Sequence, residues 1–130
     1  MIGAILAKKL ANNSFEAFNR GDIEKLMASW SEDAIYTFPG KTPISGETKG
    51  KEAIEAVHAK MLELFPQIHF TVKEVFVSNI FAMGSTNNIA VEYELTYTNH
   101  EGQKCHNSGV TIVRLKGGKV VESKEYVFNI

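Results

Sequence analysis

The spacing of apolar residues separates a helical first half of the chain from a second half with strand-like alternation. Apolar positions at helical intervals predict a first helix over residues 2–19, a short second helix capped by Asp22, and a third helix from about Lys51 to Phe65. Gly21 and Pro66 end the first and third helices. The apolar positions are Ile2, Ile5, Leu6, Leu10, Phe15 and Phe18 in the first helix, Ile23, Leu26, Met27 and Trp30 in the second, and Ile54, Val57, His58, Met61 and Phe65 in the third.

Strand signals begin with a short segment at residues 35–38, ended by Pro39-Gly40, and an extended piece around Ile44. From residue 68 onward they dominate, with strands predicted at 68–77, 89–98, 105–115 and 118–129. Consecutive apolar residues at 75–77 indicate a bulge, and turns are predicted at 85–88 and 100–102. The predicted inward faces carry Tyr36 and Phe38 in segment 35–38, Tyr93 and Tyr97 in strand 89–98, and Asn107 and Thr111 in strand 105–115.

This order of elements predicts an α+β fold in which three N-terminal helices pack on one face of a curved antiparallel sheet. A strongly curved sheet of this kind encloses a pocket against its helices. With 130 residues and no linker-like stretch, we expect one domain covering residues 1–130.

Composition narrows the possible partners. A formal charge of −1 without a basic patch argues against nucleic acid, and no apolar run approaches the roughly 20 residues that span a membrane. The short apolar piece Ile2 to Ala7 precedes its lysines, unlike a secretory signal. Cys105 is the single cysteine, which fits a reducing cytoplasm. Zinc-type spacing and a phosphate-binding glycine loop are both absent, so we expect no metal and no cofactor.

The last predicted strand carries the candidate acid. One of its faces has Glu122 and Lys124 among apolar residues, whereas the other consists of Val121, Ser123, Glu125 and Val127. A half-buried strand turns its less charged face to the core, which favours an inward Glu125. Apolar surroundings raise the pKa of a carboxyl group and suit it to proton transfer near neutral pH. A slip of one residue would instead leave Glu125 in solvent, and the pattern is compatible with both phases.

Other polar residues on the same predicted faces form a possible cluster around Glu125. Asn107 and Thr111 on the preceding strand, with Ser123, are hydrogen-bonding groups for a ligand or for backbone groups at a bulge. His58 on the third helix is either a hydrogen-bonded core residue or a second titrating group. Tyr36, Tyr93 and Tyr97 offer phenols to a ligand or to protein partners.

Several short motifs, in this order and spacing, resemble the nuclear transport factor 2-like superfamily, which includes ketosteroid isomerases, SnoaL-like polyketide cyclases and phenazine-biosynthesis isomerases. The motifs are Phe18-Asn19-Arg20-Gly21-Asp22, Trp30 with Glu32-Asp33-Ala34, Gly50-Lys51-Glu52-Ala53-Ile54 after Gly46, Leu64-Phe65-Pro66, and Gly118-Lys119-Val120-Val121-Glu122 with Glu125-Tyr126. The resemblance covers nearly the whole chain. It implies a cone of three helices against a curved sheet, a ligand pocket in its mouth, and frequent homodimers.

The resemblance also separates the branches of the superfamily. Where ketosteroid isomerases have their general base, oxyanion-hole tyrosine and protonated aspartate, this chain has Phe38, Ser14 and Thr111, so their machinery is absent. SnoaL-like cyclases and phenazine-type proteins place an acid on the last strand, which falls on Glu125. The phenazine-type Cys-x-Asn run resembles Cys105-His106-Asn107, whereas their helix histidine falls beside His58.

We therefore expect a small cofactor-independent enzyme of the isomerase, cyclase or lyase type, with Glu125 and His58 as acid–base residues. The expected ligand is a small apolar or aromatic carbonyl or enol compound, and the expected homodimer forms through the sheet face. A non-catalytic binding or dimerisation module is the alternative, because this fold serves many purposes. The residues expected to contact the ligand are Trp30, Tyr36, Phe38, Tyr93, Tyr97, Asn107, Thr111 and Ser123.

Overall fold

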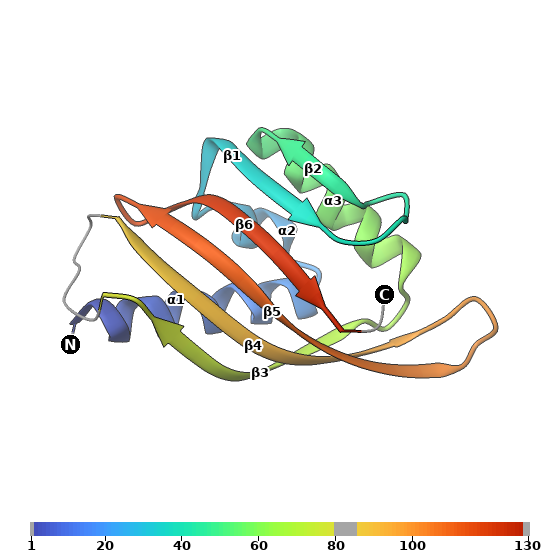
Figure 1. The fold of residues 1–130 in the computed structure, drawn as a ribbon. Coiled ribbons are helices and arrows are strands. Elements are labelled where there is room, and N and C mark those ends of the chain that lie inside the picture. Colours follow the sequence, from blue (N-terminus) through green and yellow to red (C-terminus); the bar gives the residue numbers. More distant parts are fainter. Residues whose placement is uncertain (1, 80–85, 129–130) are drawn as a thin grey trace.

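The computed structural model describes residues 2–79 and 86–128, which form three helices and six strands (Figure 1). The helices are α1 (Ile2–Asn19), α2 (Ile23–Met27) and α3 (Lys51–Leu64). The strands are β1 (Trp30–Phe38), β2 (Gly46–Lys49), β3 (His69–Val77), β4 (Asn87–Thr98), β5 (Lys104–Lys116) and β6 (Lys119–Val127). The predicted first and third helices are confirmed, and so is the α+β plan.

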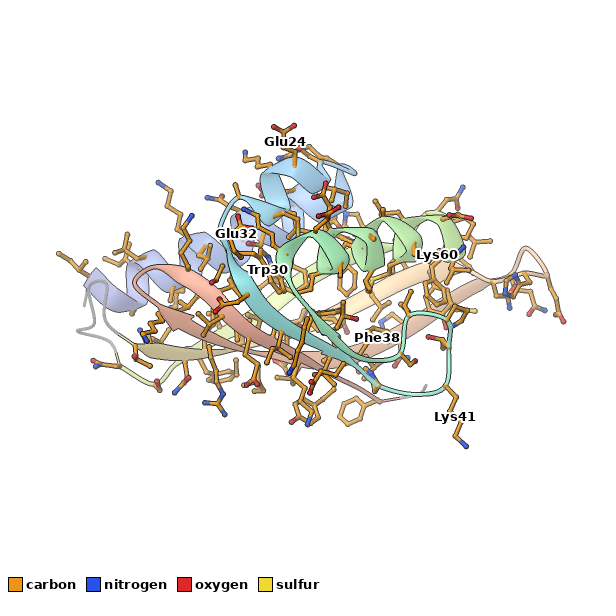
Figure 2. The ribbon with its side chains drawn as sticks, turned by 90° about the horizontal axis from the view of Figure 1, so that it is seen from above. Glu24, Trp30, Glu32, Phe38, Lys41 and Lys60 are labelled. Atoms are coloured by element: carbon orange, nitrogen blue, oxygen red, sulfur yellow. The ribbon has the colours of Figure 1, made fainter. Side chains whose placement is uncertain are left out.

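The six strands form one open sheet in the order β2-β1-β6-β5-β4-β3, and the helices cover one of its faces (Figures 1 and 2). Helix α1 lies against β3, whereas α3 lies against β1 and β2. The strands β3 to β6 pair antiparallel in succession, but β1 pairs parallel with β6. The sheet is therefore mixed, not wholly antiparallel as expected. A pairing between the first and last long strands leaves no local signal in the sequence.

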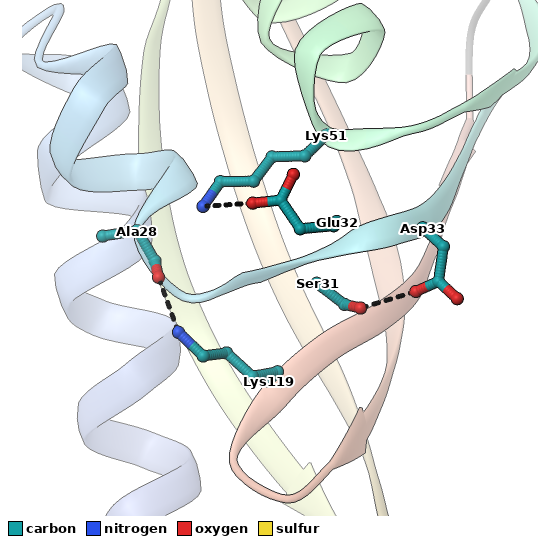
Figure 3. Close-up of polar contacts among 6 residues, drawn as sticks. All are labelled: Ala28, Ser31, Glu32, Asp33, Lys51 and Lys119. Atoms are coloured by element: carbon teal, nitrogen blue, oxygen red, sulfur yellow. Dashed lines mark hydrogen bonds and ion pairs between the residues drawn. The ribbon is translucent and has the colours of Figure 1, made fainter.

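The turn between α2 and β1 is held by the last strand (Figure 3). Lys119 Nζ donates a hydrogen bond of 3.0 Å to the carbonyl of Ala28, and the Val120 amide donates one of 2.8 Å to the carbonyl of Ser29. These bonds draw the chain into the sheet after Met27, so Trp30 begins β1. Trp30 was predicted to belong to the second helix, and this was wrong, because hydrogen bonds from β6 occupy the carbonyls of Ala28 and Ser29. Trp30 is nevertheless buried, as expected for an apolar position.

Strand β6 turns Ser123, Glu125 and Val127 toward the helices, as predicted. Its register against β5 shifts at Arg114/Leu115, which makes Val121 an extra residue in the strand. Val120 is consequently buried, and the expected inward place of Val121 was wrong. The phase assigned to Glu125 is correct because it lies beyond this bulge.

Smaller departures concern strand ends. The extended piece expected around Ile44 forms as β2, two residues later, and Ile44 itself is buried in the preceding turn. Of the turn predicted at 85–88, residue 85 lies outside the described residues, and Asn87 and Asn88 already belong to β4. The irregularity expected at 75–77 occurs slightly earlier, where the register of β3 shifts between Val72 and Glu74.

The interior between helices and sheet is rich in aromatic rings. Phe70 of β3 packs against Phe15 and Phe18 of α1, with centroids 5.3 and 5.4 Å away, and against Tyr93 of β4 at 5.0 Å. The first turns of α1 contribute less than their apolar residues predicted, because Ile2, Ile5 and Leu6 remain exposed. None of the described helices is long and apolar enough to cross a membrane.

Candidate functional site

A cavity of about 270 Å³ lies between the helices and the concave side of the sheet. Apolar side chains make up most of its lining, including Phe15, Phe18, Phe65 and Phe70. All ten residues that the sequence singled out also line it: Trp30, Tyr36 and Phe38 of β1, His58 of α3, Tyr93 and Tyr97 of β4, Asn107 and Thr111 of β5, and Ser123 and Glu125 of β6. Their location is therefore established, and their roles remain predictions.

Glu125 is the centre of a hydrogen-bonded cluster in this cavity. Thr111 Oγ1 and the Tyr93 hydroxyl donate to its Oε1 at 2.6 and 2.9 Å, and the Tyr36 hydroxyl donates to Oε2 at 3.2 Å. The pairing of β4, β5 and β6 places Thr111 directly opposite Glu125 on the inner face. Tyr36 comes from β1, next to Ser123 in the parallel register.

The two carboxylate oxygens of Glu125 are unequal. Oε1 accepts the two shorter hydrogen bonds, whereas Oε2 accepts only the 3.2 Å bond from Tyr36. Longer hydrogen bonds between oxygen atoms are weaker. Oε2 is therefore the oxygen that can gain or lose a proton, or turn to a ligand, at the smaller energetic cost.

Gly109 makes room for this arrangement. It lies opposite Tyr93 on β5, and a Cβ atom there would come within 2.9 Å of the Tyr93 hydroxyl and 2.5 Å of the Tyr126 carbonyl. Contacts that short require a shift of the ring or of the β6 backbone. The missing side chain at this position lets the Tyr93 ring cross β5 and reach Glu125.

Burial raises the pKa of the Glu125 carboxyl group above its usual value, although the hydrogen bonds from Thr111, Tyr93 and Tyr36 oppose this effect. No lysine or arginine among the described residues lines the cavity to favour the charged form. Burial and the neighbouring Glu125 also raise the pKa of Tyr36 and Tyr93 far above the ordinary tyrosine value. Both phenols consequently stay neutral hydrogen-bond donors at physiological pH.

His58 is buried against aromatic rings, with its centroid 4.8 Å from Tyr36 and 5.6 Å from Trp30. Its Nδ1 lies 2.9 Å from the carbonyl of Ile54. A carbonyl only accepts, so Nδ1 carries the proton and Nε2 has the free electron pair. Burial lowers the pKa of His58 from 6.5 to about 4, so the ring is neutral at pH 7. His58 reaches the cavity, but as a neutral imidazole.

Asn107 and Tyr97 lie apart from the acid cluster. Asn107 is two inward positions from Thr111 on β5, and its Oδ1 accepts a hydrogen bond from the Ser108 amide at 2.8 Å. Tyr97 lies near the end of β4, where its ring packs on Phe65 at 5.4 Å. The structure therefore joins Thr111, Tyr93 and Tyr36 to Glu125, and leaves Asn107 and Tyr97 at a different part of the wall.

Much of the apolar wall could not be predicted from the sequence. Phe15 and Phe18 were predicted as apolar positions of the first helix, but the helical spacing of apolar residues does not show whether they pack in a core or line a cavity. Phe70 lies in the strand predicted at 68–77, whose pattern does not show whether its inward face meets a cavity. Thr42, whose amide and hydroxyl bond Ser45 in the loop before β2, gave no signal at all.

Residues 11–123 match the SnoaL-like domain family. The chain belongs to this family. The match begins within α1 and ends within β6. Of the lining residues that the structure of this SnoaL-like chain describes, Leu10, Glu125 and Val127 lie outside the matched range. No curated protein sequence matches the chain.

Solved structures share the fold of this SnoaL-like chain at low sequence identity. Bal32a, from a soil-derived mobile gene cassette, is 21% identical with a TM-score of 0.84, over 98% of this chain and 92% of its own. TerC, crystallised with polyporic acid, is 17% identical with a TM-score of 0.79, over 95% and 92%. Rv0760c from Mycobacterium tuberculosis, in complex with estradiol-17β-hemisuccinate, is 23% identical with a TM-score of 0.76, over 96% and 95%.

Proposed function

We propose that this protein is a cofactor-independent acid–base enzyme of the isomerase, cyclase or lyase type. Its substrate would be a small, mostly apolar or aromatic compound with a carbonyl or enol group. The observation that carries the proposal is Glu125, an acid without a charged partner among the described residues, held by three hydroxyl groups in an apolar cavity.

In this mechanism the Glu125 carboxylate removes a proton from the carbon next to a carbonyl and returns it at another position. Its raised pKa brings the pKa of Glu125 closer to that of the carbon acid and makes the carboxylate a stronger base. Tyr36, whose hydrogen bond to Oε2 is the longest of the three, can turn its hydroxyl to the developing enolate oxygen. Thr111 and Tyr93 keep the carboxylate in place through Oε1.

The alternative of a passive binding module is less well supported. Such a module needs an apolar pocket, but it has no use for an acid with a raised pKa, which costs stability when it ionises. The complexes of TerC with polyporic acid and of Rv0760c with a steroid ester support a small-molecule ligand for this fold. Neither complex indicates which ligand this chain binds.

We also propose that the protein forms a homodimer through the outer face of the sheet. Phe76, Tyr126 and Phe128 expose 58%, 52% and 81% of their surface, and the strand registers place Phe76 and Tyr126 on this face. Exposed aromatic residues on one face of a sheet are typical of an interaction surface.

The function is tested by hydrogen–deuterium exchange of 2-tetralone, a neutral aromatic ketone, followed by NMR in D2O. The wild-type protein should accelerate exchange over buffer, and Glu125→Gln should lose about 100-fold or more of that rate. The wild-type rate should increase with pH through an inflection above the usual glutamate pKa of 4.5, because the base is the ionised form.

Glu92→Gln is the matched control, since Glu92 is exposed on the opposite face of β4. Its exchange rate should equal that of the wild-type protein. Undiminished exchange in a folded Glu125→Gln variant would contradict the proposed role of Glu125.

A further inference from the structure

A second polar position lies beside the acid cluster and is formed by His58 and Ser123. Ser123 pairs with Tyr36 across β6 and β1, and the His58 ring packs on the Tyr36 ring at 4.8 Å. Both residues line the cavity, with exposed fractions of 6% and 3%. Tyr36 thus connects the two positions, with its ring next to His58 and its hydroxyl on Glu125.

His58 makes its hydrogen bond through Nδ1, to the carbonyl of Ile54. Neither His58 Nε2 nor Ser123 Oγ has a hydrogen-bond partner among the described residues. Every fully enclosed side-chain nitrogen or oxygen of the described residues does have a partner. The two atoms must therefore keep some accessible surface, and the cavity that both residues line provides it. Unpaired polar atoms in an otherwise apolar pocket are the groups that orient a ligand.

The chemistry of these two atoms is specific. With its proton on Nδ1, His58 offers a lone pair at Nε2 and therefore requires a donor from the ligand. Ser123 Oγ can either donate or accept, and so can complete the hydrogen bonding of a ligand hydroxyl group.

The charge of the lining restricts the ligand further. Among the described residues, Glu125 is the sole acidic residue in the lining, and no lysine or arginine is there to pair with an anion. An anionic ligand would lose its hydration without a counterion and would face the Glu125 carboxylate. This lining therefore disfavours carboxylates and phosphates as ligands.

Resting on the proposed function for Glu125, we propose that the substrate is a neutral hydroxy-carbonyl compound whose hydroxyl group donates to His58 Nε2 and whose carbonyl part lies at Glu125. In this arrangement His58 selects the substrate and sets its orientation, and it does not transfer protons itself.

Three matched two-ring probes test this inference at pH 6.5: 6-hydroxy-2-naphthaldehyde, 6-methoxy-2-naphthaldehyde and the anion 6-hydroxy-2-naphthoate. Binding is measured by quenching of Trp30, the single tryptophan and part of the cavity lining, and by calorimetry. The hydroxy-aldehyde should bind about three- to tenfold more tightly than the methoxy compound. The anion should bind at least about 100-fold more weakly than the hydroxy-aldehyde.

His58→Phe keeps an aromatic ring among Phe18, Trp30 and Tyr36 and removes Nε2. In this variant the hydroxy and methoxy compounds should bind equally, while affinity for the methoxy compound stays as in the wild-type protein. If Phe is not tolerated, the comparison of the three probes in the wild-type protein remains decisive.

The inference is overturned if the anion binds as well as the hydroxy-aldehyde, if the hydroxy-aldehyde does not bind, or if it has no advantage over the methoxy compound. An equal loss of both neutral probes in folded His58→Phe would also overturn it. These binding results are independent of 2-tetralone exchange, so loss of exchange with intact probe selectivity would count against the proposed function alone.

Discussion

At the scale of single residues, one physical cause acts oppositely on Glu125 and His58, which both line the cavity. Burial disfavours charge, so it raises the pKa of Glu125 and lowers that of His58. Both groups therefore make stability depend on pH, but in different windows. Glu125 contributes stability that is present at low pH and lost as pH rises through its raised pKa. His58 contributes stability that is present above pH 6.5 and lost as pH falls toward its folded value of about 4.

The His58 effect gives a measurable prediction. The free energy of unfolding of the wild-type protein, relative to His58→Phe, should fall by up to about 3 kcal/mol between pH 7 and pH 4. The reason is that His58 binds a proton in the unfolded chain at pH values where it stays neutral in the folded protein. Urea denaturation of both proteins at several pH values measures this difference. A difference in unfolding free energy between the wild-type protein and His58→Phe that stays constant from pH 7 to pH 4 would contradict the prediction.

Residue-scale reasoning from the sequence found the acid but not its partners. The unequal charge of the two strand faces indicated Glu125, because that signal lies within nine residues of one strand. Tyr36 and Tyr93 were recognised as inward phenols, yet their shared target could not be predicted. Tyr36 is 89 positions from Glu125, and their contact depends on the parallel β1–β6 pair.

At the scale of secondary-structure elements, two small features position the cavity walls. Gly109 sets the distance at which Tyr93 crosses β5, and Asn19 joins the end of α1 to the edge strand β3. Neither role could be predicted from the sequence. Each depends on where a neighbouring strand lies, and the local pattern of apolar and polar residues does not determine that position.

Gly109→Ala should destabilise the fold by about 1–3 kcal/mol, because the added methyl group meets the Tyr126 carbonyl and the Tyr93 ring. It should also lower the exchange activity, since Tyr93 must leave Glu125 Oε1. Thermal unfolding and 2-tetralone exchange measure the two effects. Ser108→Ala, one residue earlier on β5, is the control and should change stability by less than about 0.5 kcal/mol. A Gly109→Ala variant with wild-type stability would show that the sheet adapts.

Asn19 acts as a short substitute for a neighbouring strand. Its side-chain amide donates to the Phe70 carbonyl and accepts from the Phe70 amide, both at 2.8 Å. Asn19→Ala should cost about 1–3 kcal/mol of unfolding free energy, because it leaves both backbone groups of Phe70 without this partner. Asn13→Ala, at an exposed position of the same helix, is the matched control. Equal denaturation midpoints for the two variants would rule out this role of Asn19.

At the scale of the whole molecule, the two faces of the sheet have different tasks. The inner face forms the cavity, and the outer face carries exposed aromatic residues beside ion pairs such as Arg114 with Glu122 at 2.9 Å. The α+β plan was predictable because long periodic segments determine it. The order of the strands was not, since β1 joins the sheet beside β6 and not beside β3.

The proposed homodimer makes a prediction at this scale. The wild-type protein should have the mass of a dimer by light scattering, and Tyr126→Glu should shift it toward the monomer, because it places a negative charge among the exposed aromatic residues of the outer face. Lys60→Gln, on the helix side of the molecule, should leave the mass unchanged. A wild-type protein with the mass of one chain would refute the dimer.

The parallel pairing of β1 with β6 also has a consequence for the order of folding. Because synthesis proceeds from the N-terminus, β6 is the last of the nine elements to leave the ribosome, yet it occupies the interior of the sheet between β1 and β5. Until then β1 and β2 have only each other and the helices as partners, and the edge of β5 is open. The native sheet therefore cannot be completed before β6 emerges. The pairing of β6 with β1 and β5 also brings Glu125 to its three hydroxyl partners.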